Sequence, residues 1–185
     1  KKSLETDDQT VYDALTGLVK GETSFIDWRE QSHPRWMQCA DIFNTETLST
    51  SIVHARAWQV LADMAEELGQ KATAKVAGAR AQSIAESINR MLWMPDKGYY
   101  GMYLYGRDHL IMNPRAETLG EALAIMWGIA DEQRSRSITE HNPTTPFGAA
   151  IFYPQIADMP PYHNNALWPW VASWWALANA RVGNE

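Results

Sequence analysis

The chain has 185 residues, of which 45% are hydrophobic, so it is long and apolar enough for one packed domain or part of a larger one. Its net charge of −6 argues against a nucleic-acid partner, because phosphate binding requires a basic patch. No apolar run is long enough to span a membrane, and the single Cys39 excludes an internal disulfide and a cysteine-based zinc site.

Both ends of the sequence favour a fragment. The chain opens at Lys1-Lys2 without a methionine, and it closes at Gly183-Asn184-Glu185, a pattern typical of a helix C-cap. We therefore interpret residues 1–185 as a single, partial domain that is completed by the remainder of the same longer polypeptide.

In chain order, residues 7–19 are predicted to form the end of a helix that leads into a loop. Apolar residues then recur with helical spacing over residues 53–68, and Gly69 ends that helix. A second helix is predicted over residues 71–93, with its charges largely on other faces than its apolar residues. The short joint between these two helices predicts an antiparallel hairpin.

Aromatic and β-branched residues follow the helical hairpin. Residues 94–98 have the composition of a turn, and Tyr99 to Met112 is predicted to form a small β-hairpin around Gly106-Arg107-Asp108. A third helix is predicted over residues 116–127 and a short polar helix over residues 131–139. Residues 141–164 hold five of the nine prolines and form a long loop, of the kind that usually carries function.

The last predicted helix spans residues 166–181 and has no charged residue between Ala166 and Ala180. A helix that is apolar on all sides is expected to be buried on all sides. The helix over residues 71–93 has one charged face instead, so the two kinds of helix suggest two concentric helical layers. The sequence therefore predicts an all-α fold with a small β-hairpin insertion.

A carboxylate lies between aromatic residues and a cation in the first loop. Asp27 follows Phe25-Ile26 and precedes Trp28-Arg29. Apolar neighbours raise the pKa of a carboxyl by desolvation, whereas a nearby arginine lowers it. A carboxyl that stays protonated near neutral pH can donate its proton to a leaving glycosidic oxygen. The alternative is a structural role for Asp27, as a helix N-cap or as an ion pair with Arg29 or Arg35.

Polar groups also stand at the entrance of an apolar, tryptophan-rich segment, Tyr162-His163-Asn164-Asn165-Ala166-Leu167-Trp168-Pro169-Trp170. His163 and Asn164 can hold sugar hydroxyls there, or Asn164 or Asn165 can cap the following helix. Trp168 and Trp170 are two positions apart and would face different sides of a helix, so at most one of them is expected to line a pocket.

The first loop continues with residues suited to a sugar. Trp36 can stack on a sugar ring and Arg35 can bond its hydroxyls, and the alternative is that Trp36 only anchors the loop.

No sequence pattern for a metal or a cofactor occurs. The five histidines are scattered, and neither a phosphate-binding glycine loop nor a nucleophilic serine elbow is present. We therefore expect no metal and no cofactor, and carboxylate chemistry is the default class for an enzyme with this sequence.

The two motifs together resemble those of the six-hairpin glycosidases. Residues 22–29 are similar to the general-acid loop of that group, which includes processing α-glucosidases of family 63, trehalases, the amylo-1,6-glucosidase module of debranching enzymes and disaccharide phosphorylases. Residues 162–170 resemble the Tyr-His-Asn-Gly-x-Val-Trp-Pro-Trp segment of the debranching and phosphorylase members, with Asn165 in place of Gly and Leu167 in place of Val. Residues 113–117 lie where the group often carries a turn into an inner helix.

The resemblance implies an (α/α)6 toroid of helical hairpins, of which this chain would form a part, with the site at the narrow end. It implies that Asp27 is the general acid. In several members the general base follows the final motif helix, beyond residue 185, and within this chain Glu117 is the candidate, with Glu121 behind it. Either glutamate can instead compensate a helix dipole. The residues implied to bind the sugar are Trp28, Arg29, Arg35, Trp36, Tyr162, His163, Asn164 and Trp168.

These features predict an inverting α-glycosidase that acts on α-linked, glucose-type oligosaccharides. Asp27 would protonate the leaving oxygen while a carboxylate on the opposite face of the sugar activates water. Two alternatives stay open. One is a catalytically silent, carbohydrate-binding relative that lacks a paired base. The other is a structural domain of helical hairpins in which the tryptophans only pack.

Overall fold

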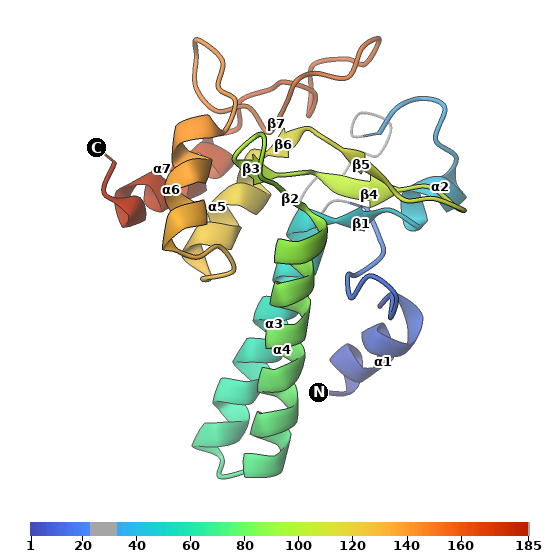
Figure 1. Cartoon of the computed structure of the whole chain (residues 1–185), viewed down its shortest axis with the longest axis vertical. Coiled ribbons are helices and arrows are strands. Elements are labelled where there is room, and N and C mark those ends of the chain that lie inside the picture. Colours follow the sequence, from blue (N-terminus) through green and yellow to red (C-terminus); the bar gives the residue numbers. More distant parts are fainter. Residues whose placement is uncertain (23–32, 185) are drawn as a thin grey trace.

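The computed structural model describes residues 1–22 and 33–184. A long helical hairpin forms one end of the molecule, and small sheets, loops and shorter helices gather at the other end (Figure 1). The hairpin consists of α3 (Leu48–Glu67) and α4 (Lys71–Met91), joined at Gly69 with φ +69°. The predicted antiparallel helical hairpin is therefore confirmed.

The two helices pack through a row of small and branched side chains. Alanines on both helices allow the backbones to approach each other, and two isoleucines fill the space nearer the sheets. The buried residues of this row are Ala55, Trp58, Ala62 and Ala65 on α3, and Ala77, Ala81, Ile84 and Ile88 on α4.

Three small antiparallel sheets lie at the start of α3. Strand β4 (Tyr103–Tyr105) pairs with β1 (Glu46–Thr47) on one side and with β5 (Ile111–Asn113) on the other. Strand β2 (Trp93–Met94) pairs with β3 (Tyr99–Tyr100), and β6 (Ala116–Glu117) pairs with β7 (Phe152–Tyr153). The predicted β-hairpin is confirmed in β4 and β5. The prediction of an all-α fold is confirmed only in part, since small sheets are combined with the helices. Strands of two or three residues are too short to show an alternating pattern in the sequence.

Hydrogen bonds tie the hairpin to the rest of the fold. The hydroxyl of Tyr100 on β3 donates to Oδ1 of Asn89 on α4 at 2.6 Å. The amide of Asn89 in turn donates to the carbonyl oxygen of Ile129 at 2.9 Å. The end of α4 is thereby fixed to the segment that follows the next helix.

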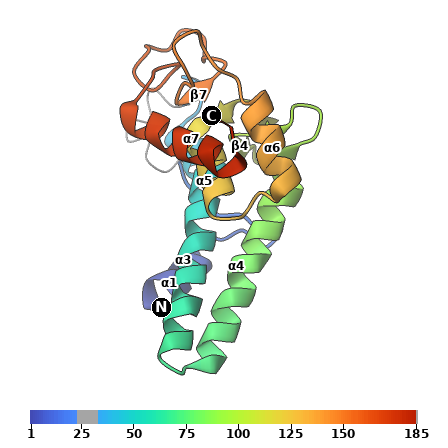
Figure 2. The ribbon, with the colours of Figure 1, turned by 90° about the vertical axis from the view of Figure 1, so that its left-hand side faces the viewer.

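Three helices form a second packing unit (Figure 2). These are α5 (Thr118–Met126), α6 (Glu132–His141) and α7 (Pro169–Val182), and α7 contacts both of the others. The predicted polar helix at 131–139 is confirmed as α6, and its N-cap Asp131 accepts a hydrogen bond from the backbone N–H of Arg134 at 2.8 Å.

Helix α7 differs from its prediction in two respects. It begins at Pro169 and not at Ala166, because proline suits the first helical position and keeps the residue before it extended. It is also not buried on all sides. Val171 and Ala178 are buried, whereas Leu177 is 53% exposed, because α7 packs on α5 and α6 along one side. The two concentric layers are accordingly not complete in the described residues.

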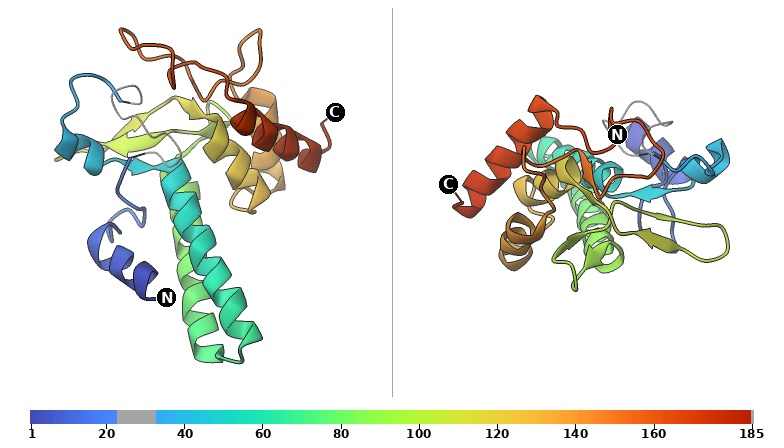
Figure 3. Two further views of the ribbon diagram at one scale, coloured as in Figure 1. Left: turned by 180° about the vertical axis from the view of Figure 1, so that it is seen from behind. Right: turned by 90° about the horizontal axis from the view of Figure 1, so that it is seen from above.

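The N-terminal segment also departs from the expected helix at 7–19. Helix α1 (Lys2–Thr10) ends earlier, and a turn with a bridge between Tyr12 and Val19 follows it. Seen from behind, α1 lies beside the hairpin (Figure 3), where Arg80 of α4 pairs with Asp8 at 2.8 Å. A short helix that the sequence did not predict, α2 (Cys39–Phe43), precedes β1. Across residues 1–22 and 33–184, no helix has both the length and the apolar composition needed to cross a membrane.

The packing of the hairpin yields a first prediction. Ile84 is 0% exposed between α3 and α4, so Ile84→Ala leaves a cavity and should lower the free energy of unfolding by about 3 kcal/mol. Val76 lies on the same helix and is 68% exposed. Val76→Ala should therefore change the free energy of unfolding by less than about 0.5 kcal/mol. Urea unfolding followed by circular dichroism measures both variants, and equal effects would contradict this packing.

Candidate functional site

Strand pairing brings two separate motifs together. Glu117 on β6 pairs with Phe152 on β7, and Phe152 forms a parallel bridge with Asn164. Two residues further on, the carbonyl oxygen of Ala166 accepts a hydrogen bond from the N–H of Ile151 at 2.8 Å. The turn at 113–117 and the segment at 162–168 therefore lie on either side of β7.

Glu117 is a fully buried carboxyl at the N-cap position of α5. Among the described residues, neither of its oxygens has a hydrogen-bond partner of normal geometry. Burial raises the pKa of Glu117 to about 7, although the hydroxyl and N–H of Ser49 and the N–H of Gly120 face the carboxyl and oppose the rise. The result is a desolvated acid that titrates near neutral pH.

The close approach of Glu117 depends on Gly120. A Cβ atom at position 120 would stand 2.9 Å from Oε2 of Glu117 and 2.8 Å from Cδ2 of Leu48, closer than van der Waals contact allows. A glycine in the first turn of α5 is therefore needed for the carboxyl to fold back against the start of α3.

Glu121 lies one turn further along α5 and is also fully buried. Its Oε1 accepts a hydrogen bond from the N–H of Tyr100 at 2.8 Å, and its Oε2 has no partner among the residues described. Burial raises the pKa of Glu121 well above its ordinary value; the Tyr100 N–H opposes this and the charge of Glu117 adds to it. The two carboxyls therefore disfavour each other's ionisation.

An aromatic cluster lies in the segment at 162–168. The ring of Tyr162 lies 4.8 Å from that of His163 and 5.3 Å from that of Trp168, and the Trp168 indole N–H donates to the Tyr162 carbonyl oxygen at 3.2 Å. His163 is 0% exposed, whereas Tyr162 is 45% exposed. The rings of Trp168 and Trp170 are 6.4 Å apart, so the expectation that they face different sides is wrong, because Trp168 precedes the helix.

Asn164 serves as a loop clamp in this structure. Its Oδ1 accepts from the N–H of Ile156 at 2.6 Å, and its Nδ2 donates to the carbonyl oxygens of Ile156 and Met159 at 2.8 and 2.9 Å. The residue is 2% exposed, so its amide is committed to the backbone of the 156–159 loop. The N-cap of α7 is Trp168, so the alternative in which Asn164 or Asn165 caps the helix is wrong.

Arg35 and Trp36 lie against a different sheet from the Tyr162 cluster. Trp36 is 59% exposed, and its ring is 5.8 Å from that of Tyr105 on β4. Arg35 is also exposed. The ring of His33, just before them, stacks on Tyr103 at 5.3 Å.

Asp27, Trp28 and Arg29 lie outside the described residues. The residues before them are held at the start of α3: Gly21 N–H donates to the carbonyl oxygen of Thr45, and the Thr50 hydroxyl donates to that of Glu22, both at 2.8 Å. Ser49, which faces Glu117, belongs to the same helical turn.

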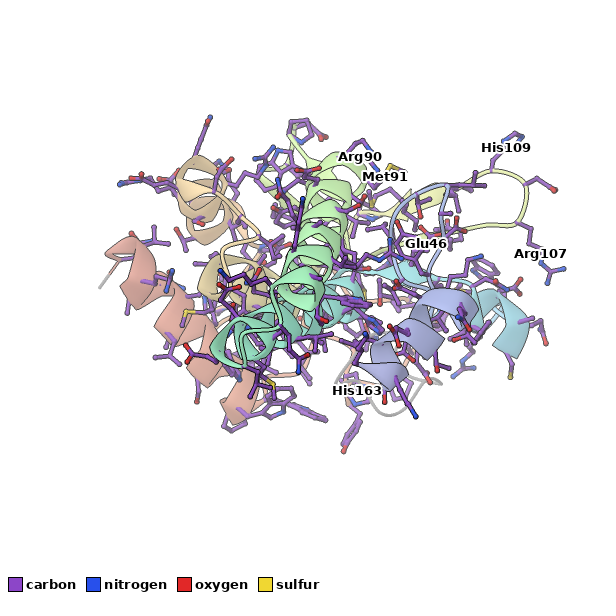
Figure 4. All side chains as sticks on the ribbon, turned by 90° about the horizontal axis from the view of Figure 1, so that it is seen from below. Glu46, Arg90, Met91, Arg107, His109 and His163 are labelled. Atoms are coloured by element: carbon purple, nitrogen blue, oxygen red, sulfur yellow. The ribbon has the colours of Figure 1, made fainter. Side chains whose placement is uncertain are left out.

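Figure 4 shows Glu46, Arg107 and His109 apart from His163. Glu46 on β1 is buried, and burial raises its pKa while the Thr16 hydroxyl opposes the rise. Arg107 and His109 project from the turn between β4 and β5, where Arg107 pairs with Asp41 at 2.7 Å. Within the part of the chain that the structure describes, no group of three or more His, Cys, Asp or Glu side chains could hold a metal ion.

Several residues that shape the site carried no signal in the sequence. Ser49 and Tyr100 reach Glu117 and Glu121 from distant parts of the chain, through contacts that only the fold creates. Arg115 clamps the neighbouring loop, since its Nε donates to the carbonyl oxygen of Pro154 at 2.7 Å. The position of Arg115 within residues 113–117 was the one indication of its role in the sequence.

Comparison with known families now identifies the fold. A family model described as the mannosylglycerate hydrolase MGH1-like glycoside hydrolase domain matches residues 5–181. The chain therefore belongs to this family, which is of the six-hairpin glycosidase type. No curated protein matches the sequence.

Two solved structures share the fold. Neutral trehalase from Saccharomyces cerevisiae is 14% identical, with a TM-score of 0.64 over 77% of this chain and 29% of its own. A family GH78 rhamnosidase from Bacillus sp. GL1 is 18% identical, with a TM-score of 0.61 over 98% of this chain and 16% of its own. Both are (α/α)6 toroid glycosidases, and this chain spans less than a third of the length of either.

The buried carboxyl yields a second prediction, on stability. A pKa raised on folding from 4.5 to about 7 means that native Glu117 binds more protons than the unfolded chain between these pH values. Its contribution to stability is therefore fully present below pH 4.5 and is lost as the pH rises to about 7, a change of about 3 kcal/mol. Glu117→Gln should reduce this loss, as measured by urea unfolding at a series of pH values.

Glu67 provides the matched control for this measurement. It is an exposed glutamate near the end of α3, so Glu67→Gln should keep the pH dependence of the unmodified chain. An unchanged pH dependence in Glu117→Gln would mean that the carboxyl is not desolvated.

Proposed function

We propose that this chain carries part of the active site of an inverting α-glycosidase that acts on α-linked, glucose-type oligosaccharides. Membership of a glycoside hydrolase family supports the reaction class. The observation that carries the proposal is a buried carboxyl, Glu117, which titrates near pH 7 and lies one strand away from an aromatic cluster. Carboxyl pairs whose pKa values are separated by their surroundings are characteristic of glycosidases.

Asp27 is the proposed general acid, on the strength of its motif. In the reaction, its proton passes to the glycosidic oxygen as the bond from that oxygen to the anomeric carbon breaks. A water molecule attacks the anomeric carbon from the opposite face and gives its proton to a second carboxylate. Inversion requires about 6.5–9.5 Å between the two carboxyl groups, so that the water fits between them.

Glu117 is the proposed second carboxylate within this chain. A base must be ionised, so a pKa of about 7 makes Glu117 competent above neutral pH. Oxygens without an internal hydrogen-bond partner of normal geometry among the described residues are suited to accept one from water. Burial also raises the pKa of Glu121 well above its ordinary value, which favours the neutral form of that carboxyl and limits the negative charge of the pair.

The aromatic cluster is the proposed sugar-binding wall. Tyr162 and Trp168 offer ring faces at the edge of the cluster, and His163 lies between them and the interior. Aromatic rings can cover the C–H face of a sugar while polar neighbours bind its hydroxyls. Asn164 acts through the loop that it clamps, and Trp28, Arg29, Arg35 and Trp36 are proposed from the first motif.

The exposed side of α7 is proposed to pack against further helical hairpins of the same polypeptide. Leu177 is 53% and Trp170 37% exposed on a helix that has no charge before Arg181. The toroid structures that resemble this chain are more than three times as long as the part it matches, so they contain elements that can cover such a face.

A catalytically silent, carbohydrate-binding domain is the second candidate function. It is favoured by the high pKa of Glu117, which leaves about half of the carboxyl protonated at neutral pH and so weakens it as a base. Such a domain would keep the aromatic cluster and bind oligosaccharides without releasing product.

Hydrolysis by the full-length protein tests the proposal. The substrates are maltooligosaccharides and, because of the family's name, mannosylglycerate. Asp27→Asn and Glu117→Gln should each lower kcat by about 100-fold or more, and kcat/KM of the unmodified enzyme should rise with pH, with a midpoint at about 7, as Glu117 ionises. Proton NMR of the first product should show the inverted anomer.

Glu67→Gln is again the control and should keep full activity, because Glu67 is exposed on α3. Near-normal hydrolysis of every active substrate by Asp27→Asn would refute its role as the acid. Calorimetric binding of oligosaccharides without any product would select the silent domain instead.

A further inference from the structure

A hollow with a volume of about 450 Å³ lies beside the Tyr162 segment. Its walls come from the turn at 144–147, from Tyr153 at the end of β7, and from Asn165 and Leu167. Glu117 and His163 are not among its lining residues. The hollow is therefore separate from Glu117 and His163, although the chain joins it to the Tyr162 segment through residues 163–167.

An aromatic ring stands at the rim of this hollow. Phe147 is 86% exposed, although exposing so large an apolar side chain is unfavourable for an isolated chain. Its turn is nevertheless well ordered: the Phe147 N–H donates to the Thr145 hydroxyl at 3.2 Å, and Thr145 and Gly148 exchange backbone hydrogen bonds of 2.8 and 3.0 Å. The ring is thus held in the open, as a stacking platform requires.

A polar residue, Asn165, also lines the hollow. Asn165 has φ +61°, a left-handed conformation that costs free energy for any residue with a Cβ atom. Glycine adopts this conformation without strain, and the motif that this segment resembles carries Gly at the position. Asn165 is one of the residues that line the hollow, and its buried Oδ1 has no hydrogen-bond partner among the described residues. The position with this unfavourable backbone conformation is thus occupied by a residue whose side chain has an unused hydrogen-bond acceptor.

The chemistry of the lining indicates the class of ligand. Its residues are Thr, Pro, Phe, Tyr, Asn and Leu, so the lining combines ring faces and hydroxyl and amide groups with no charged side chain. A phosphate or a uronic acid would find no cation there. A neutral hexopyranose has one C–H face for the Phe147 ring and hydroxyls for Asn165 and the exposed Thr144.

We propose that this hollow is an outer subsite, which binds a neutral sugar unit of an oligosaccharide whose scissile end occupies the Glu117 site. Phe147 stacks on the ring of this unit and the Asn165 amide bonds its hydroxyls. The inference rests on the proposed function and adds to it a preference for longer chains. Asn165, which replaces Gly, is then one of the residues that determine which length of oligosaccharide is preferred.

Two variants of the full-length protein test the subsite. Phe147→Ala removes the platform, and Asn165→Gly removes the amide while keeping a residue that suits the left-handed backbone. Each variant should lower kcat/KM for maltopentaose by about 10-fold, because KM rises. For an aryl α-glucoside, which does not reach the subsite, kcat/KM should change by less than about 2-fold. Phe43 on α2, which is 55% exposed, gives the matched control Phe43→Ala, with neither value changed. Equal losses on both substrates, or no loss, would overturn the subsite.

A binding measurement separates the subsite from the proposed function. Maltopentaose is added to the isotope-labelled protein while the side-chain amide signals of Asn165 and the backbone signals of residues 144–147 are followed by NMR. Shifts in these signals support the subsite even where no substrate is hydrolysed, an outcome that would refute only the glycosidase. Hydrolysis without these shifts overturns the subsite and leaves the glycosidase standing, and a protein that neither binds nor hydrolyses overturns both.

Discussion

Desolvation of the Glu117 carboxyl is the physical constraint on which the proposed chemistry of this molecule depends. A carboxyl without hydrogen bonds of normal geometry from the described residues is costly to bury, and it stays ionisable near neutral pH only because Ser49 and Gly120 face it. Three elements create this environment, namely the start of α3, the first turn of α5 and the β6–β7 pair. A fold optimised for stability alone would place an apolar side chain there, so the buried acid supports the functional role proposed for it.

The helical hairpin that stabilises the fold and the residues of the proposed site lie in different parts of the molecule. The α3–α4 hairpin buries alanines and isoleucines and carries no proposed site residue away from its first turn. The described motif segments at 113–117 and 162–168 lie on short strands and loops outside this hairpin. Loops can position chemical groups accurately only when hydrogen bonds hold them in place, and here Arg115 and Asn164 both donate to carbonyl oxygens of the loop that follows β7.

The sequence was informative where local patterns determine the structure. Helical spacing around Gly69 predicted the hairpin, and Asp131 marked the start of α6. It was misleading for α7, because a stretch without charges was taken to mean burial, whereas burial depends on the neighbours that are present. Glu117 was a candidate from the sequence, but its desolvation could not be predicted, since Ser49 and the β6–β7 pairing come from distant parts of the chain. The interaction of Trp168 with Trp170 was missed because Pro169 begins the helix.

The most direct test of the central claim is the ionisation of Glu117 itself. Carbon-13 NMR of the side-chain carboxyl groups in glutamate-labelled protein, with Glu117→Gln to assign the signal, gives its pKa in the folded state. We expect a midpoint at about 7, far above the ordinary value of 4.5. A midpoint near 4.5 would show that water reaches the carboxyl, and it would contradict the desolvated site on which the proposed chemistry depends.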